Sequence, residues 1–139
     1  MQPPSPKPFS ICFAEDLIIA DWTGFPTVEA IRASYEEAMA QPEFRKGMPV
    51  LAIIHPQVPF PSNDHLRYIP LVIAPYHQRT GPLALVVKSD IHMGLARMLC
   101  SHCHMVGLQT EVFTNIQSAH GWLSSTTGGH KKAHASNIG

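Results

Sequence analysis

The stretch "GPLALVVKSDIHMGLARM" (residues 81–98) decides the fold, because it joins a buried strand directly to a helix. Its first part is a continuous apolar run rich in Leu and Val, which is typical of a strand covered on both faces. Gly81 and Pro82 mark the start of that strand. A helix then begins near Asp90, whose charge suits the positive end of a helix, and Gly107 is expected to help end it.

The same order of strand and helix recurs on both sides of this stretch. Upstream, residues 48–56 are a second apolar run rich in Val and Ile. Residues 64–78 follow as a helix that Pro70 and Pro75 are expected to make irregular or to divide. Downstream, residues 110–115 predict a strand and residues 116–125 a short helix. Strands that alternate with helices pair in parallel through right-handed crossovers.

The N-terminal part adds an antiparallel element. Residues 9–16 and 17–24 are rich in Ile and Phe and predict two short strands, with Glu15 and Asp16 as a tight turn between them. Residues 27–40 have helical spacing of apolar side chains, with Thr27 as the N-cap. The predicted fold is therefore α/β: a mixed sheet of about five strands, with an N-terminal antiparallel hairpin and later parallel strands, covered by about four helices.

Length, composition and charge limit the class of protein. The 139 residues are 45% hydrophobic and carry a formal net charge of +0, which favours one folded domain and gives no general attraction to nucleic acid. We assign residues 9–124 to that domain, 1–8 to a flexible Pro-rich leader and 125–139 to a polar, disordered tail. The sequence shows no secretory signal and no apolar run long enough to form a transmembrane segment, so a cytoplasmic location is expected.

Three stretches carry a resemblance to a known family: "PEFRKGMPVLAII" (42–54), "GPLALVVKSDIHMGLARM" (81–98) and "TEVFTNIQSAHGWL" (110–123). In this order and spacing the chain resembles the SpoIIAA-like branch of the STAS superfamily, also labelled STAS/SEC14-like, over residues 9–124. The resemblance implies a domain without chemistry of its own, hence no enzyme activity and no cofactor. Similar STAS domains act as anti-sigma-factor antagonists or regulatory modules, and SEC14-like relatives hold lipophilic ligands.

One functional residue of the family, the phosphorylated serine, can be matched to this sequence, and the matching residue is Ser62. In STAS antagonists the phosphorylated serine follows the third strand at the start of the next helix, and Ser62 in "IIHPQVPFPSNDHL" (53–66) is the nearest match. The sequence departs from the family there, because His55 and Pro56 stand where an acidic residue usually ends the strand, and the Asp-Ser-Ser-Gly pattern is absent. The favoured interpretation is that Ser62 is an N-cap. A phosphorylation-switched anti-sigma-factor antagonist is the second alternative function.

The most conspicuous motif is "CSHCH" (100–104), which has the C-x-x-C-H spacing of covalent haem attachment. On a helix, however, Cys100 and Cys103 fall in the apolar stripe with Leu99 and Val106, while His104 lies at the edge of that stripe. Free cysteine packs as a small hydrophobe, so buried core thiols are the favoured interpretation. The first alternative function is a thiol redox or metal-binding protein that uses Cys100, Cys103 and His104.

The helix expected over residues 64–78 is apolar almost all round. Such a helix is either an irregular, deeply buried core helix or one that covers a ligand or a partner. On the following helix, two methionines seven residues apart form an outward stripe suited to adaptable contacts. The predicted ligand or partner surface comprises Leu66, Ile69, Val72, Ile73, Tyr76, Met98 and Met105. The predicted function is a non-catalytic regulatory or binding module for a small lipophilic ligand or a protein partner, including a second copy of the chain.

Overall fold

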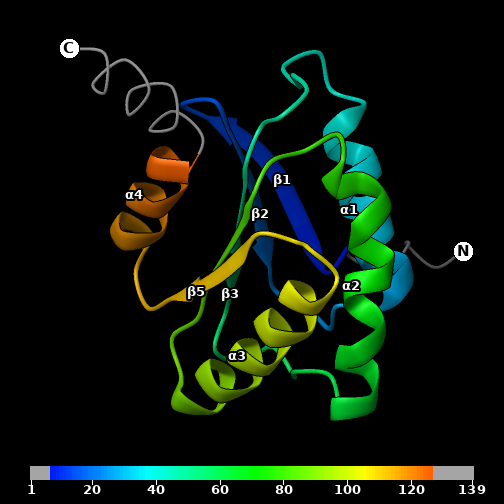
Figure 1. Cartoon of the computed structure of the whole chain (residues 1–139), viewed down its shortest axis with the longest axis vertical. Helices are drawn as coiled ribbons and strands as arrows, with labels where there is room; N and C mark the ends of the chain where they lie inside the picture. The colour runs from blue at the N-terminus through cyan, green and yellow to red at the C-terminus, as the bar shows by residue number, and fades with distance from the viewer. Residues whose placement is uncertain (1–6, 127–139) are drawn as a thin grey trace, which may run out of the picture.

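The structure, a computed structural model, describes residues 7–126, which form a five-stranded sheet with helices on both faces (Figure 1). The strands are adjacent in chain order: β1 (Phe9–Ala14), β2 (Leu17–Trp22), β3 (Val50–Ile54), β4 (Leu83–Val86) and β5 (Thr110–Phe113). β1 and β2 are antiparallel and the other neighbours are parallel, which confirms the predicted fold class. Residues 1–6 of the predicted leader and 127–139 of the predicted tail lie outside the described residues.

Within residues 7–126, four helices cover this sheet: α1 (Val28–Met39), α2 (Asn63–His77), α3 (Asp90–Met105) and α4 (Ile116–Thr126). The order of the five described strands advances in one direction, so right-handed crossovers place α1, α2 and α3 on the same side of the sheet. We call this side the front face. α4 follows the last strand and lies on the other side, the back face, over β4 and β5 (Figure 1).

The hairpin of β1 and β2 is closed by Glu15 and Asp16, as predicted. Both residues have a positive φ, of 53° and 67°, and Ala14 pairs directly with Leu17. Two central residues with positive φ define a type I′ turn, whose twist matches that of the flanking strands. The turn fixes the register of the hairpin, so that alternate residues of β2 face the front and the back of the sheet.

Each of three helices begins at a side chain that accepts a hydrogen bond from a backbone N–H. Thr27 Oγ1 accepts from Ala30 at 3.0 Å, which confirms the predicted cap of α1. Ser89 Oγ accepts from His92 at 3.1 Å at the start of α3. Asn115 Oδ1 accepts from Ser118 at the start of α4. The last two caps were not predicted, although Ser and Asn at these positions are the usual signal.

The end of α3 confirms the role of Gly107 and corrects that of Val106. Gly107 has a φ of +81°, and the N–H of Leu108 donates to the carbonyl of Cys103 at 3.0 Å, which is the pattern of a Schellman motif. Val106 was expected in the buried stripe, but its side chain is 47% exposed. The expectation was wrong because the helix ends at Met105, so Val106 no longer follows the helical spacing.

α2 is one helix with Pro70 and Pro75 inside it, so of the two expected effects of its prolines, division does not occur. Pro70 lacks an N–H, which removes one hydrogen bond of the helix, and interior prolines cost about 3 kcal/mol. The helix is nevertheless held against the sheet, because Leu66, Ile69 and Ile73 are buried and Pro70 itself is fully buried. Burial of these side chains outweighs the local cost of the proline.

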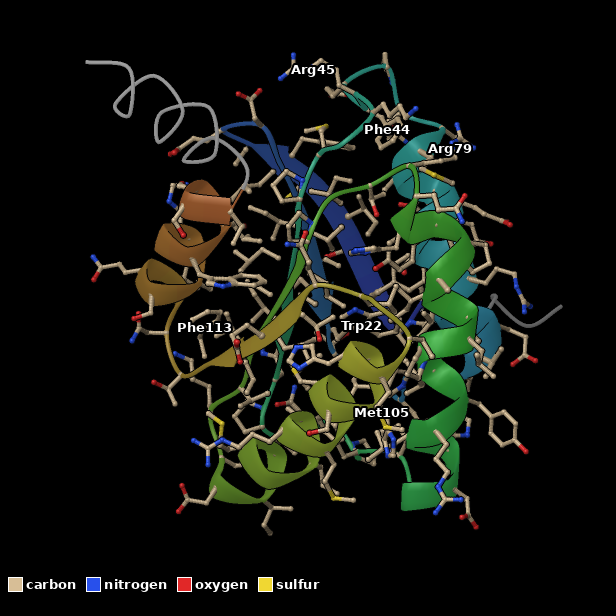
Figure 2. All side chains as sticks on the ribbon, viewed as in Figure 1. Trp22, Phe44, Arg45, Arg79, Met105 and Phe113 are labelled. Carbon is tan, nitrogen blue, oxygen red and sulfur yellow. The ribbon has the colours of Figure 1, made fainter. Side chains whose placement is uncertain are left out.

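The sheet separates two hydrophobic clusters. The front cluster joins β-strand side chains to α1, α2 and α3. The back cluster is small and involves α4, and its buried members are Leu17, Leu51, Ala84, Val86, Ala119 and Leu123. At its margin Phe113 of β5 lies toward α4, with its ring 5.8 Å from that of Trp122 (Figure 2). The last helix is therefore attached by a few deeply buried side chains.

Candidate ligand-binding pocket

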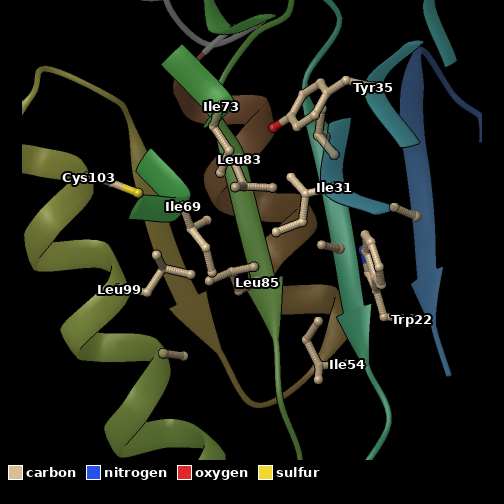
Figure 3. Packing of buried hydrophobic residues seen from close by; sticks show 14 of the residues in the cluster. Trp22, Ile31, Tyr35, Ile54, Ile69, Ile73, Leu83, Leu85, Leu99 and Cys103 are labelled. Carbon is tan, nitrogen blue, oxygen red and sulfur yellow. The ribbon is translucent and has the colours of Figure 1, made fainter. Parts of the chain in front are cut away.

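A cavity of about 80 Å³ lies in the front layer, between the sheet and the helices. Its floor is formed by side chains of β2, β3 and β4, and its walls by side chains of α1, α2 and α3 (Figure 3). The lining residues are Ala20, Trp22, Pro26, Ile31, Ser34, Tyr35, Val50, Ala52, Ile54, Phe60, Pro61, Ile69, Ile73, Leu83, Leu85 and Leu99. The pocket thus collects side chains from six elements and two loops.

The lining is apolar, and its polar groups are already engaged or neutral. The Ser34 hydroxyl donates to the carbonyl of Ile31 at 2.7 Å, so it is satisfied within its own helix. Tyr35 stacks on Tyr76, with ring centroids 5.1 Å apart and planes 6° apart. Burial, and to a lesser extent the nearby Cys103, raises the pKa of Tyr35 well above its usual range, so its phenol is uncharged at neutral pH. Such a lining favours an apolar ligand.

The lining residues of the cavity that reach the surface lie beyond the carboxyl ends of β2 and β3. Among its lining residues, Pro26 and Phe60 alone are partly exposed, while the others are buried. Pro26 lies between β2 and α1, and Phe60 lies in the Pro-rich loop 55–61 between β3 and α2. We call the space between these two residues the mouth of the cavity. A ligand that enters from solvent would pass Phe60.

The structure places the predicted ligand-binding residues of α2 at different depths. Ile69 and Ile73 line the cavity. Leu66 is fully buried in the front cluster but does not line the cavity. Val72 is partly buried and packs against the same cluster. Tyr76 lies behind Tyr35, and its hydroxyl donates to Glu36 Oε2 at 2.9 Å. The part of α2 that lines the cavity is therefore smaller than the predicted surface.

The remaining predicted surface residues are exposed and lie away from the cavity. Met98 and Met105 on α3 are 38% and 82% exposed. On α2, Tyr68 and Leu71 are 62% and 60% exposed, so the outward side of this helix carries large apolar side chains. The interaction of these side chains with a second copy of the chain or with a regulatory protein stays a prediction.

The cysteine cluster is packed into the front core, which confirms the predicted burial of both thiols. Cys100 and Cys103 are buried. Burial raises the pKa of Cys100 to about 11 and that of Cys103 to about 12, so both remain thiols at neutral pH. His104 Nε2 lies 2.8 Å from the carbonyl oxygen of Thr110. These features favour a packing role over the redox or metal alternative.

Ser62 is the N-cap of α2. Its Oγ accepts a hydrogen bond from the N–H of His65, at a long 3.4 Å, and the residue is exposed at the helix start. Capping accounts for a serine at this position. Its phosphorylation stays a prediction.

Sequence reasoning missed most of the pocket. Trp22 and Phe60, two aromatic lining residues, were not singled out, although an aromatic residue between two prolines in "PFP" (59–61) was a usable signal. Ile31 of α1 and Ile54 of β3 also line the cavity. In the sequence, both have the spacing of ordinary core residues. A cavity depends on how distant elements meet, which local periodicity does not report.

Comparisons with known proteins place no further constraint on the pocket. No family model matches the chain, and no curated protein or solved structure matches it significantly. Within residues 7–126, no helix is long and apolar enough to cross a membrane. In the same part of the chain, no three His, Cys, Asp or Glu side chains are grouped so that they could hold a metal ion.

Proposed function

We propose that this protein is a non-catalytic binding module of the STAS/SEC14-like kind, whose front-layer cavity accepts a small apolar ligand. The observation that carries the proposal is the apolar cavity with a mouth at Phe60 and Pro26. The sheet topology is compatible with a STAS-like domain, since an N-terminal hairpin precedes strands that alternate with helices. A resident ligand would then couple binding to the packing of α1 and α2 on the sheet.

The size of the cavity limits the ligand. An apolar cavity of roughly 150 Å³ holds benzene, whereas this one measures about 80 Å³. A saturated group of a few carbons therefore enters with little rearrangement. A longer alkyl chain requires movement of a lining side chain, and Phe60 is suited to move because it is partly exposed and lies in a loop.

The proposal is tested with cyclopentane as the probe, whose ring is close to benzene in volume and therefore enters only when Phe60 moves outward. A ligand that binds the folded state alone raises the stability of the protein by mass action, so the melting temperature is expected to rise with cyclopentane concentration and, once the site is filled, to keep rising with the logarithm of that concentration. Ala52→Ile places extra carbons into the cavity from β3 and is expected to abolish the rise. Leu71→Ala, on the exposed side of α2, is the matched control and should keep it. A rise of equal size in the Ala52→Ile variant would contradict binding in this cavity.

A further inference from the structure

His92 lies directly behind the mouth of the cavity. It is the third residue of α3 and is 5% exposed, and its ring packs against the Phe60 ring with centroids 5.0 Å apart. Its Nε2 lies 2.8 Å from the carbonyl oxygen of Val58, in the same loop as Phe60. The Phe60 side chain therefore separates a buried imidazole from the cavity that it lines.

The bond to Val58 fixes which nitrogen of His92 carries the proton. A carbonyl oxygen can only accept, so Nε2 must be the donor, and in the neutral ring Nδ1 is then a hydrogen-bond acceptor. Nδ1 is buried and has no hydrogen-bond partner among residues 7–126. A buried acceptor left without a partner costs free energy, which a ligand carrying a hydroxyl donor would recover.

We infer that Phe60 is a gate and that His92 Nδ1 is the polar contact of the pocket, so that the preferred ligand is an amphiphile with a short alkyl chain and a hydroxyl group. The inference rests on the proposed function, because the alkyl chain occupies the apolar cavity. Outward movement of Phe60 enlarges the cavity and uncovers the His92 ring against which Phe60 packs. The chain then packs against Ile69 and Ile73, and the hydroxyl donates to His92.

The two parts of this inference are separated by a matched pair of probes, 1-hexanol and 1-methoxypentane. Both have the same number of heavy atoms, but the alcohol alone can donate a hydrogen bond. We expect the full-length protein to bind 1-hexanol roughly tenfold more tightly, as the fold-change for one buried hydrogen bond. Equal dissociation constants, measured by calorimetric titration, would overturn the role of His92 and leave the apolar pocket intact. Binding of neither probe would contradict the proposed function itself.

Two variants and one spectrum complete the test. His92→Leu is expected to make the two dissociation constants equal, and a preference that persists in it would overturn the inference. Phe60→Ala opens the gate, so both probes should bind more tightly while the tenfold ratio remains; weaker binding of both would contradict the gate. If His92→Leu does not fold, the ¹⁵N resonance of His92 Nδ1 in the unaltered protein decides: it should shift with 1-hexanol and not with 1-methoxypentane, and an unmoved resonance would overturn the inference.

Discussion

The two faces of the sheet are packed differently, although both are covered by helices. On the front face, three helices cover the strands but leave a cavity of about 80 Å³ between α1, α2, α3 and the sheet. On the back face, α4 covers β4 and β5 through a compact cluster to which it contributes Ala119 and Leu123, both fully buried. The pocket residues all belong to the front layer. The comparison indicates that the back face serves stability, while the front face retains room that a ligand could fill.

The largest expected difference between the faces is the effect of alkaline pH on the free energy of unfolding. The front face buries Cys100 and Cys103, whose pKa values are raised from 9.0 to about 11 and about 12, whereas the buried back cluster carries no ionisable group. In the unfolded chain both thiols ionise above pH 9, so the stabilisation is complete below that pH and is lost as the pH rises toward the folded values. The loss amounts to about 1.4 kcal/mol per pH unit for each thiol.

Urea unfolding at pH 8 and pH 10 measures this effect. The free energy of unfolding is expected to fall by about 3 kcal/mol between these pH values through the two thiols together. The double variant Cys100→Ala/Cys103→Ala serves as the control and should lose most of this decrease. An equal decrease in the double variant would mean that other groups cause the alkaline instability.

A matched pair of alanines gives the next largest effect. Ala84 is fully buried in the back cluster, and Ala52 lines the cavity on the front face. Ala84→Ile adds carbons where the alanine is already fully buried and is expected to lower the free energy of unfolding by about 2 kcal/mol. The same change at Ala52 enters the cavity and is expected to raise it by about 1 kcal/mol. Both values are measured by chemical denaturation, and equal destabilisation by the two variants would show that the faces are equally well packed.

The elements of the fold could be predicted because their signals are local. The apolar runs of β3 and β4, the Glu15-Asp16 turn and the Thr27 cap each depend on a few neighbouring residues. The helical spacing of α3 likewise placed Cys100 and Cys103 in the core. These are the features that periodicity and turn chemistry report.

The pocket could be predicted only in part, for a physical reason. Ile69 and Ile73 were among the predicted ligand residues and exposed Leu71 was not, but the prediction also included Leu66 and Tyr76, which do not line the cavity. Trp22, Phe60 and His92 come together from segments far apart in the chain. Their proximity follows from the assembled sheet and helices, which no local pattern records.

Methyl NMR of the protein titrated with cyclopentane tests the central claim most directly, because it reports which face responds. With Ile and Leu methyl groups labelled, the resonances of Ile31, Ile54, Ile69 and Ile73 around the cavity should shift in a saturable manner. Those of Leu17, Leu51 and Leu123 in the back cluster should stay in place. Shifts confined to the back cluster, or no saturable shift of the cavity methyl groups, would contradict the account.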